Sequence, residues 1–246
     1  MISVIPVEGL PEIEAGADLA ALIAGAVRLE DGDVLVVAQK AVSKAEGRIV
    51  RLADVEPSQQ ARELAGDGDP RHVQVILDET ARIVRSRPPL VIAETRHGLI
   101  CASAGVDHSN APEAGTLVLL PLDSDASARL LRERLGELSG STVGVIVTDS
   151  FGRPFRAGTT DVAIGVAGIP ALLELRGTTD RIGYVLRSSR VAIADEIAAA
   201  ADLARGKAEG VPVVVVRGLA LRGEGTAAEL VIEPAEDLFR SSSSGW

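Results

Sequence analysis

Residues 143–150 read Val-Gly-Val-Ile-Val-Thr-Asp-Ser, and residues 151–156 continue as Phe-Gly-Arg-Pro-Phe-Arg. A short run of β-branched residues predicts a buried strand, and this run stops on the acid Asp149. A carboxylate, a hydroxyl and two guanidinium groups gather at the strand end. Oxygen ligands hold hard cations, and arginines hold phosphate or carboxylate. The other interpretation is that Asp149 only caps a turn and the arginines are solvated, because Asp is common in turns.

A second segment has the same character. Residues 98–110 read Gly-Leu-Ile-Cys-Ala-Ser-Ala-Gly-Val-Asp-His-Ser-Asn, so an apolar stretch again ends in small residues and then in an acid, Asp107. If Asp107 and Asp149 meet at one end of a sheet, they can share Mg²⁺ or Mn²⁺. Such an ion needs few protein carboxylates and takes its other ligands from nucleotide phosphates and water. The spacing alone leaves open whether the two acids meet.

The composition excludes some classes of protein. Hydrophobic residues make up 46% of the chain but aromatic residues only 2%, so Val, Ile, Leu and Ala must build the core. This favours a soluble α/β-type protein over a nucleic-acid binder that stacks bases on aromatic rings. A formal net charge of −10 argues against broad binding to nucleic acid or anionic membranes. Locally clustered Lys and Arg must therefore meet any anionic substrate.

The cysteine content and hydropathy bear on location. Cys101 is the only cysteine, which rules out an intrachain disulfide and favours the reducing cytoplasm. Its apolar neighbours favour a small core residue over a nucleophile. No apolar stretch approaches the roughly 18–20 uncharged residues of a spanning helix, and the N-terminus lacks the basic start of a signal peptide. We therefore expect a cytoplasmic protein.

Strands and helices intermix along the chain. The residue patterns predict strands over 2–7, 33–37, 117–120, 185–193 and 211–216, and a hairpin formed by 90–93 and 99–102. Helices are predicted from Leu19 to Val27, from Pro70 to Val84 after an Asp69 cap, and over 123–138 and 195–207. Thr226 and Glu229 predict a capping box that opens a short helix. Residues 162–168 are interrupted by glycine and fit no clear element.

Several standard site signatures do not occur in the sequence. There is no G-x-x-x-x-G-K-[ST] phosphate loop, no complete dinucleotide fingerprint and no G-x-S-x-G elbow, and a single cysteine excludes cysteine-rich zinc sites. The histidines are scattered, and only His108 lies beside a candidate ligand, where we expect a hydrogen-bonding or exposed role. Any nucleotide site in this chain is therefore of an unusual kind.

Several short segments occur together and in a characteristic order. They are residues 6–11 (Pro-Val-Glu-Gly-Leu-Pro), 31–34 (Asp-Gly-Asp-Val), 42–48 (Val-Ser-Lys-Ala-Glu-Gly-Arg), 104–110, 148–153, 191–199 and 212–218. In this order, over nearly the whole chain, they resemble the γ-glutamyl ligase family of coenzyme F-420 biosynthesis. Any one segment alone would be weak, but the ordered set is highly specific.

The resemblance implies an activity and a fold. It implies a GTP-dependent ligase that joins L-glutamate through an amide bond to the side-chain carboxylate of a deazaflavin phospholactate, and it leaves open whether further γ-linked glutamates are added. The implied intermediate is an acyl phosphate, because a carboxylate is a poor electrophile until its oxygen becomes a leaving group. The implied subunit is α+β, with mixed and antiparallel sheets and packed helices in a γ-glutamyl ligase-like fold, and it forms a homodimer.

The resemblance also implies metal ligands. The family uses Mg²⁺ or Mn²⁺, with two ions expected and K⁺ as a further candidate. By matching motif, Asp107 and Asp149 resemble ligands of one ion and Ser150 a ligand of the second, where the family often has Thr. Lys207 stands where some members have an acid, so either Glu209 replaces that ligand or water and phosphate hold the second ion.

The GTP contacts are carried over in the same way. The residues at matching positions are Leu10, Pro11, Glu12, Ile13, Gln39, Lys40, Lys44 and Asn110, followed by the loop Arg205, Gly206, Lys207, Ala208, Glu209, Gly210 and Val211. Lys44 is the strongest of them, as an ammonium for phosphate; the alternative is a surface lysine. The 205–211 loop is about one residue shorter than the family pattern.

Other charged residues are assigned from charge and position only. Arg153 and Arg156 suit the phosphate or carboxylate of the substrate and are our candidate catalytic residues. Asp195 and Glu196 fit either a site or the first turn of a helix, where the helix dipole favours acids. The role of Asp161 stays open.

We expect one ligase domain over residues 1–240 and a disordered tail over 241–246. Some relatives carry a flavin-binding domain after the ligase, so the chain is either a standalone ligase or part of a longer protein. Two rival functions remain. A metal-dependent phosphohydrolase would use the same aspartates with water as acceptor, and a non-catalytic nucleotide-binding module would bind GTP without turnover.

Overall fold

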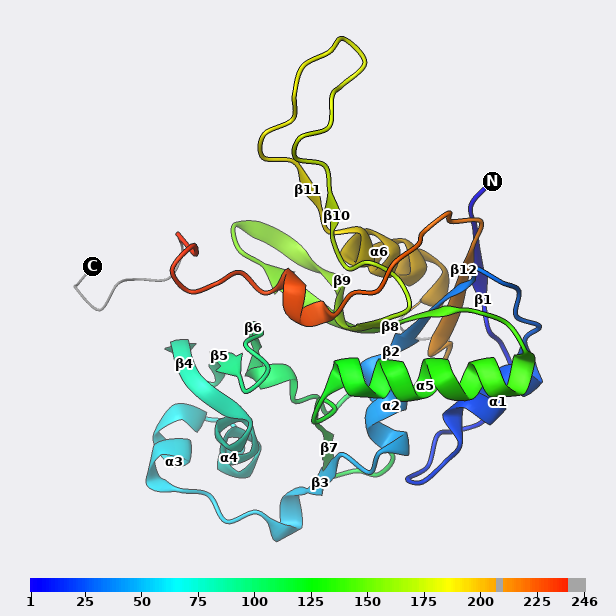
Figure 1. The fold of residues 1–246 in the computed structure, drawn as a ribbon. Helices are drawn as coiled ribbons and strands as arrows, with labels where there is room; N and C mark the ends of the chain where they lie inside the picture. The colour runs from blue at the N-terminus through cyan, green and yellow to red at the C-terminus, as the bar shows by residue number, and fades with distance from the viewer. Residues whose placement is uncertain (207–209, 239–246) are drawn as a thin grey trace.

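The computed structural model describes residues 1–206 and 210–238, and it has an α+β fold (Figure 1). A five-stranded sheet forms the centre, with the order β1-β12-β2-β8-β9. Its strands are β1 (Ser3–Pro6), β12 (Val213–Arg217), β2 (Val34–Ala38), β8 (Gly144–Arg153) and β9 (Arg156–Ala167). Only β2 and β8 pair in parallel, and the other neighbours are antiparallel, so the sheet is mixed.

The central strands are buried on both faces. Alternate residues of β2 point to opposite sides, with Leu35 and Val37 in one core cluster and Val34 and Val36 in the other. Helices α1 (Leu19–Ala26) and α5 (Ser124–Ser139) cover the first face, and α6 (Ile193–Arg205) covers the second. Val and Ile fit such strands because their branched side chains pack closely on a pleated surface.

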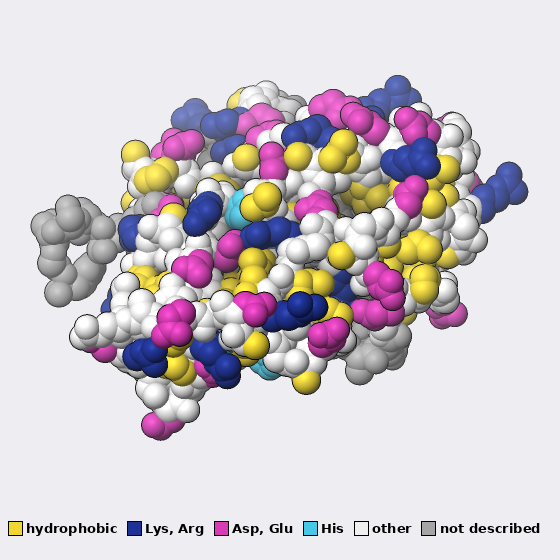
Figure 2. Space-filling view, turned by 90° about the horizontal axis from the view of Figure 1, so that it is seen from below, with side chains coloured by type: hydrophobic (Ala, Val, Ile, Leu, Met, Phe, Trp, Pro, Cys, Tyr) yellow, Lys and Arg dark blue, Asp and Glu magenta, His cyan; other side chains and the backbone are white. Residues whose placement is uncertain are grey.

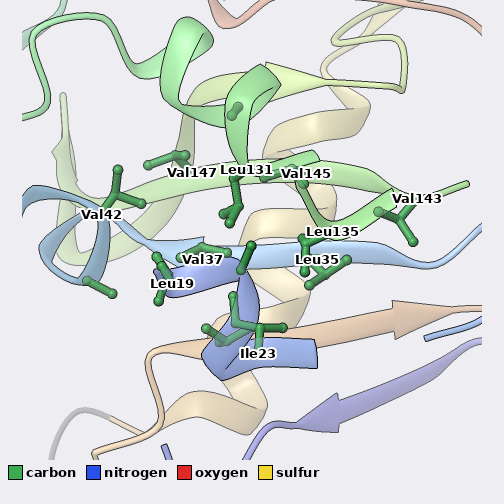
Figure 3. Close-up of a cluster of buried hydrophobic side chains, with 14 of the residues drawn as sticks. Leu19, Ile23, Leu35, Val37, Val42, Leu131, Leu135, Val143, Val145 and Val147 are labelled. Carbon is green, nitrogen blue, oxygen red and sulfur yellow. The ribbon is translucent and has the colours of Figure 1, made fainter. Parts of the chain in front are cut away.

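The first core cluster joins the two covering helices to the sheet (Figure 3). Leu131 and Leu135 of α5 and Ile23 of α1 pack with Val145 and Val147 of β8. Aspartates cap the starts of both helices, since Asp18 accepts the N–H of Ala21 and Asp123 accepts the N–H of Ala126. These caps satisfy backbone donors that the first helical turn leaves free.

A smaller layer lies beside the central sheet. It contains the antiparallel strands β4 (Thr80–Arg87), β5 (Leu90–Thr95) and β6 (Ile100–Ala102), with α3 (Gln59–Ala65) and α4 (Pro70–Asp78). Its own core packs Val75 and Ile76 against Val91 and Ala93. The pair β3 (Ile49–Arg51) and β7 (Thr116–Val118) lies between this layer and the main body (Figure 1).

The remaining elements are short. Helix α2 (Gln39–Ala45) follows β2 directly, and β10 (Leu173–Glu174) and β11 (Arg190–Val191) form the base of a projecting arm. The described residues also form the 3₁₀ turns η1 (Leu52–Asp54), η2 (Ser103–Gly105) and η3 (Ala227–Leu230). No helix within 1–206 and 210–238 is both long and apolar enough to cross a membrane.

The strand at residues 143–150 does not end at Asp149 as predicted. β8 runs on to Arg153 and pairs with β9, so Asp149 lies opposite Val162 inside a long hairpin. The hydrophobic pattern marks where burial ends, whereas backbone pairing with β9 continues beyond it. The register shifts between Val147 and Thr148, where Ile164 is the extra residue of a bulge on β9.

Two further boundaries were wrong. The helix predicted from Pro70 to Val84 ends at Asp78, and Val84 belongs to β4, whose β-branched residues favour a strand. Residues 185–193 are not one strand, because Arg190–Val191 pair with β10, Val185 forms an isolated bridge with Thr179, and α6 already begins at Ile193. Apolar residues in the arm resemble a strand in sequence although they are exposed.

Other predicted elements are confirmed. The hairpin of 90–93 and 99–102 forms between β5 and β6. Residues 162–168, for which the sequence predicted no element, belong largely to β9. Thr226 and Glu229 form the expected capping box at η3. The predicted end of the helix at Lys207 and the tail 241–246 lie outside the described residues.

Two glycines provide a matched test of the packing. A Cβ at Gly165 would lie 2.2 Å from the carbonyl oxygen of Ser124, whereas a Cβ at Gly25 in α1 would meet nothing within 4 Å. We expect Gly165→Ala to lower the melting temperature by several degrees, because β9 and α5 must move apart. We expect Gly25→Ala to stabilise the protein by about 0.5–1 kcal/mol, because alanine loses less entropy in a helix. Thermal unfolding measures both, and equal effects of the two variants would contradict this packing.

Candidate functional site

The parallel pair β2 and β8 sets the position of the candidate site. In this register Ala38, the last residue of β2, lies beside Thr148. Helix α2 begins at the next residue of the first strand, and Asp149 is the next residue of the second. Carboxyl ends of neighbouring parallel strands form a common edge at which α/β proteins bind ligands. The lysines of α2 and the acid of β8 therefore meet at one edge of the sheet.

Lys40 and Asp107 form an ion pair at this edge. The Nζ atom of Lys40 lies 2.6 Å from Oδ2 of Asp107 and donates to Oγ of Ser109 at 2.5 Å. The Ser109 backbone N–H donates to Oδ1 of Asp107 at 2.7 Å. Burial acts to raise the pKa of Asp107, but the hydrogen bonds from Lys40 and Ser109 outweigh it and hold that pKa below its ordinary value. The carboxylate is therefore charged at neutral pH.

Asp149 has the opposite electrostatic balance. Burial raises its pKa to about 7, and the charges of Asp107 and Asp161 act in the same direction. The backbone N–H of Ser150 and the charge of Lys40 oppose the shift without overcoming it. Asp107, Asp149 and Lys40 thus belong to one interacting cluster, and it contains a carboxylate whose charged form the protein alone does not favour.

This cluster suits a divalent cation. A cation would stabilise the ionised form of Asp149 that burial disfavours. In the part of the chain that the structure describes, no group of three or more His, Cys, Asp or Glu side chains is arranged to hold a metal. Two carboxylates still fit Mg²⁺ or Mn²⁺, whose shell phosphate and water can complete. Metal binding by Asp107 and Asp149 remains a prediction.

Burial also decides the role of Cys101. The thiol is free and only 7% exposed, and burial followed by the nearby charge of Asp149 raises its pKa to about 12. A thiol that stays protonated is a poor nucleophile. Cys101 is therefore a core residue, as the sequence predicted.

Ser150 faces the opposite side of β8 from Asp149. Its Oγ atom donates a hydrogen bond of 2.6 Å to Oδ1 of Asp161, the residue opposite it in the hairpin. Asp161 is 2% exposed and pairs with Arg205, whose Nη1 lies 2.5 Å from Oδ2. The guanidinium of Arg205, a predicted GTP contact, is therefore held in a buried ion pair. Asp161 could have been found from its hairpin register with Ser150, had β9 been recognised.

Lys44 is not a surface lysine. It is 7% exposed and pairs with the carboxylate of Glu12, which brings the predicted GTP loop to α2. Leu10 and Ile13, on either side of Pro11 and Glu12 in that loop, pack in the first core cluster. Gln39 is also buried, accepts a hydrogen bond from Ser43 Oγ at 2.8 Å, and has an Nε2 atom without a partner among the described residues.

Asn110 lines a pocket of about 490 Å³. The pocket extends from Asp107's loop to helix α4, and His108 and His72 line it with their ring centroids 6.1 Å apart, edge to face. Asn110 has a positive φ of 56°, which Asn tolerates better than most residues. The loop thus extends from the acidic cluster to a pocket large enough for part of a ligand.

The candidate catalytic arginines lie farther away. Arg153 and Arg156 flank the turn of the β8–β9 hairpin. Arg153 is four residues from Asp149, or about 13 Å along an extended strand. Its Nη2 donates to the carbonyl oxygen of Ala157 at 3.1 Å. The structure does not bring these arginines against the acidic cluster, and their role stays a prediction.

The loop after α6 returns to the same edge. The backbone N–H of Ala38 donates to the carbonyl oxygen of Pro212 at 2.8 Å, so the loop ends beside the start of α2. Gly206 and Gly210 both have positive φ, and Val211 packs against the second core cluster. The predicted contacts Lys207, Ala208 and Glu209, including the second-metal candidate Glu209, lie outside the described residues.

Asp195 has a structural role. Its Oδ1 atom accepts the backbone N–H of Ala163 at 2.8 Å and so ties α6 to β9 beside the bulge. Burial raises its pKa despite this hydrogen bond.

Acidic and basic side chains are interspersed on the face drawn in Figure 2, where no single sign of charge dominates.

The comparisons with known proteins cover this whole site. The profile of the family described as F420-0:Gamma-glutamyl ligase matches residues 9–218, from just before Leu10 to beyond Val211. The chain belongs to this family. The chain is 48% identical to a coenzyme F420:L-glutamate ligase of Methanopyrus kandleri over 237 residues, which cover 93% of this chain and 94% of the relative.

Two more ligases agree with this assignment. The chain is 47% identical to the coenzyme F420:L-glutamate ligase of Archaeoglobus fulgidus, over 97% of this chain and 96% of the relative. It is 43% identical to the one of Methanothermobacter thermautotrophicus, over 97% of this chain and 99% of the relative. As a member of the γ-glutamyl ligase family, the protein is an enzyme that forms carbon–nitrogen bonds.

The raised pKa of Asp149 predicts that this carboxylate lowers the stability of the metal-free protein at neutral pH. The pKa rises from an ordinary 3.8 to about 7. Between these values the unfolded chain loses a proton that the folded protein keeps, so the free energy of unfolding falls as pH rises from about 4 to about 7. We expect Asp149→Asn to raise the melting temperature of the metal-free protein at pH 8, and to converge with wild type near pH 4.

Asp107→Asn is the matched control. The pKa of Asp107 is lowered, so its ionised form stabilises the fold and the asparagine should lower the melting temperature at pH 8. Added Mn²⁺ should stabilise wild type and neither variant, because a ligand that binds only the folded state raises stability. Calorimetry at both pH values tests this, and a destabilised Asp149→Asn protein at pH 8 would refute the assignment.

Proposed function

We propose that the protein is a GTP-dependent ligase of coenzyme F-420 biosynthesis. It joins L-glutamate through an amide bond to the side-chain carboxylate of a deazaflavin phospholactate, and the assay below counts the glutamates that are added. Family membership and the printed names of the similar ligases support the glutamate and coenzyme F420 substrates. The observation that carries the proposal is the gathering of Lys40, Lys44, Asp107 and Asp149 at one sheet edge inside the matched region.

The chemistry needs an activated carboxylate. Transfer of the GTP γ-phosphoryl to the acceptor carboxylate gives an acyl phosphate, and the glutamate amine attacks its carbonyl carbon and releases phosphate. The ammonium groups of Lys40 and Lys44 suit the binding of phosphate. Lys40 now pairs with Asp107 and Lys44 with Glu12, and when these ion pairs open, the ammonium N–H groups can donate to phosphate oxygens instead. Positioning and charge neutralisation are the main contributions that such phosphoryl transfer requires.

Asp107 and Asp149 would hold one ion, and Ser150 with Glu209 a second. When bound, Mg²⁺ or Mn²⁺ neutralises charge on the transferred phosphoryl group, and K⁺ is a further candidate. Arg153 and Arg156 are proposed to receive the anionic acceptor, because a protein with net charge −10 must meet an anion with local cations. Their exposed turn leaves room for a large acceptor.

The decisive assay follows both products. Purified protein is incubated with the glutamate-free deazaflavin precursor, L-glutamate, GTP and Mn²⁺, while product mass and GDP are measured together. We expect a mass gain of one or more glutamyl units matched to GDP. Asp149→Asn should lower the rate by at least 100-fold, because it removes a charged ligand while keeping the side-chain shape.

The matched control for this assay is Asp67→Asn. Asp67 is exposed in the turn between α3 and α4, away from the proposed site and from the projecting arm, so the rate should stay within about twofold. GDP without glutamylation would favour the metal-dependent phosphohydrolase. Binding of GTP without either product would favour a non-catalytic nucleotide-binding module. Both results would contradict the ligase.

We also propose a cytoplasmic homodimer. The arm between β10 and β11 projects from the body (Figure 1), and Ile182, Tyr184 and Val185 on it are 86%, 62% and 46% exposed. Exposed apolar side chains grouped on one projection are typical of an interaction surface. The single buried cysteine is compatible with a reducing compartment.

The arm can be tested by light scattering. We expect wild type to have the mass of a dimer, and Ile182→Ser combined with Tyr184→Ser to shift it toward the monomer, because the apolar contact area is lost. Leu130→Ser on α5, a residue 66% exposed, is the control and should keep the wild-type mass. A wild-type monomer, or a dimer that resists the arm substitutions, would contradict this assignment.

A further inference from the structure

A buried polar network lies beneath Ser150. Asp161 accepts hydrogen bonds from Ser150 Oγ at 2.6 Å and from Thr148 Oγ1 at 3.1 Å. Arg205 Nη1 lies 2.5 Å from Asp161 Oδ2 and donates to Thr148 Oγ1 at 3.0 Å. Its Nη2 reaches the carbonyl oxygen of Val36 at 3.3 Å. The network joins β2, β8, β9 and α6 below the exposed Ser150.

The network uses both oxygens of Asp161. Oδ1 accepts from Ser150, and Oδ2 accepts from Thr148 and Arg205. The residue is only 2% exposed, so solvent and ligands do not reach it directly. Asp161 is therefore placed to act through Ser150 and not as a ligand itself.

The hydrogen bond fixes the donor role of Ser150. A hydroxyl has one proton and two lone pairs, and Ser150 gives its proton to a carboxylate on the buried side. Its lone pairs are then free to accept a cation. A carboxylate partner also makes the ligand atom more basic, as partners behind metal ligands commonly do.

Arg205 balances the charge of Asp161. A buried carboxylate needs a partner that offsets its desolvation, and removing one member of a buried ion pair leaves an uncompensated charge. The guanidinium is 9% exposed and is held by Asp161, Thr148 and Val36. In this geometry its charge serves the network below the site instead of a nucleotide above it.

We propose that Asp161 and Arg205 form a positioning pair that orients the Ser150 hydroxyl as a ligand for the second divalent cation. The inference rests on the proposed metal-dependent function and deepens it. It also gives Arg205 an indirect role in place of a direct GTP contact.

The test measures Mn²⁺ binding and not turnover. Bound Mn²⁺ is counted by electron paramagnetic resonance in the presence of a non-hydrolysable GTP analogue. We expect Asp161→Asn to weaken the second, weaker ion at least 10-fold and to leave the first within about twofold, the range typical of partners behind a metal ligand. Ser150→Ala should weaken the same ion to a similar extent.

A double-mutant cycle separates positioning from general damage. If Asp161 acts through Ser150, Asp161→Asn should have no further effect on Mn²⁺ affinity in a Ser150→Ala background. A structural role would lower the melting temperature equally in both backgrounds and weaken both ions. Equal losses of affinity in both backgrounds would overturn the proposal.

Asp33 provides a matched control. It is a buried aspartate paired with an arginine, Arg217, at 2.7 Å, and it directly precedes β2 at the opposite end from Ala38. Asp33→Asn should lower the melting temperature and leave the affinity for both ions within twofold. A comparable loss of the second ion in this variant would show that destabilisation alone explains the effect.

A second variant covers the case in which Asp161→Asn does not fold. Asp161→Leu combined with Arg205→Met removes anion and cation together, a replacement that is often neutral for stability. It should weaken the second ion at least 10-fold and preserve the first. Unchanged Mn²⁺ binding in this variant would overturn the positioning pair alone, whereas a wild-type protein that binds no Mn²⁺ would overturn both it and the metal-dependent function.

Discussion

The parallel pairing of β2 with β8 is the constraint on which the candidate site depends. It aligns Ala38 with Thr148, so the helix that carries Lys40 and Lys44 begins beside the strand residue Asp149. Antiparallel pairing would carry the same residues to opposite ends of the sheet. Three loops also contact this edge. The Asp107 loop pairs with Lys40, and the N-terminal loop pairs with Lys44 through Glu12. The loop after α6 accepts a hydrogen bond from the backbone N–H of Ala38.

The site combines two kinds of carboxylate. Asp107 is compensated by a lysine and stabilises the fold in its charged form, whereas Asp149 is held under conditions that disfavour its charge. The folded protein thus holds a carboxylate whose charged form burial disfavours, a cost that the proposed cation would offset. Perturbed acids of this kind cluster at functional sites, where stability is exchanged for chemistry. The buried pair of Asp161 and Arg205 contributes differently, since its charges balance each other.

The sequence predicted what depends on local pattern. The buried strands, the Asp69 cap and the β5–β6 hairpin follow from residue type and spacing. What escaped prediction depends on partners remote in the chain. β8 continues past Asp149 only because β9 pairs with it, and Val84 is a strand residue only because β5 lies beside it. Likewise Arg205 looked available to a ligand because its partner lies 44 positions away in sequence.

The bulge at Ile164 determines which side chains β9 presents to each layer. Val166, which follows the bulge, faces the α6 layer, and so do Ala163 and Asp161, which precede it. In a strand without a bulge, Val166 would face the opposite layer from Ala163 and Asp161. Deleting Ile164 would therefore restore regular pairing and leave Asp161 opposite Ser150 and Val162 opposite Asp149. The bulge thus absorbs one residue of chain length: a one-residue deletion here keeps the contents of the two layers, whereas the present length paired without a bulge would exchange them.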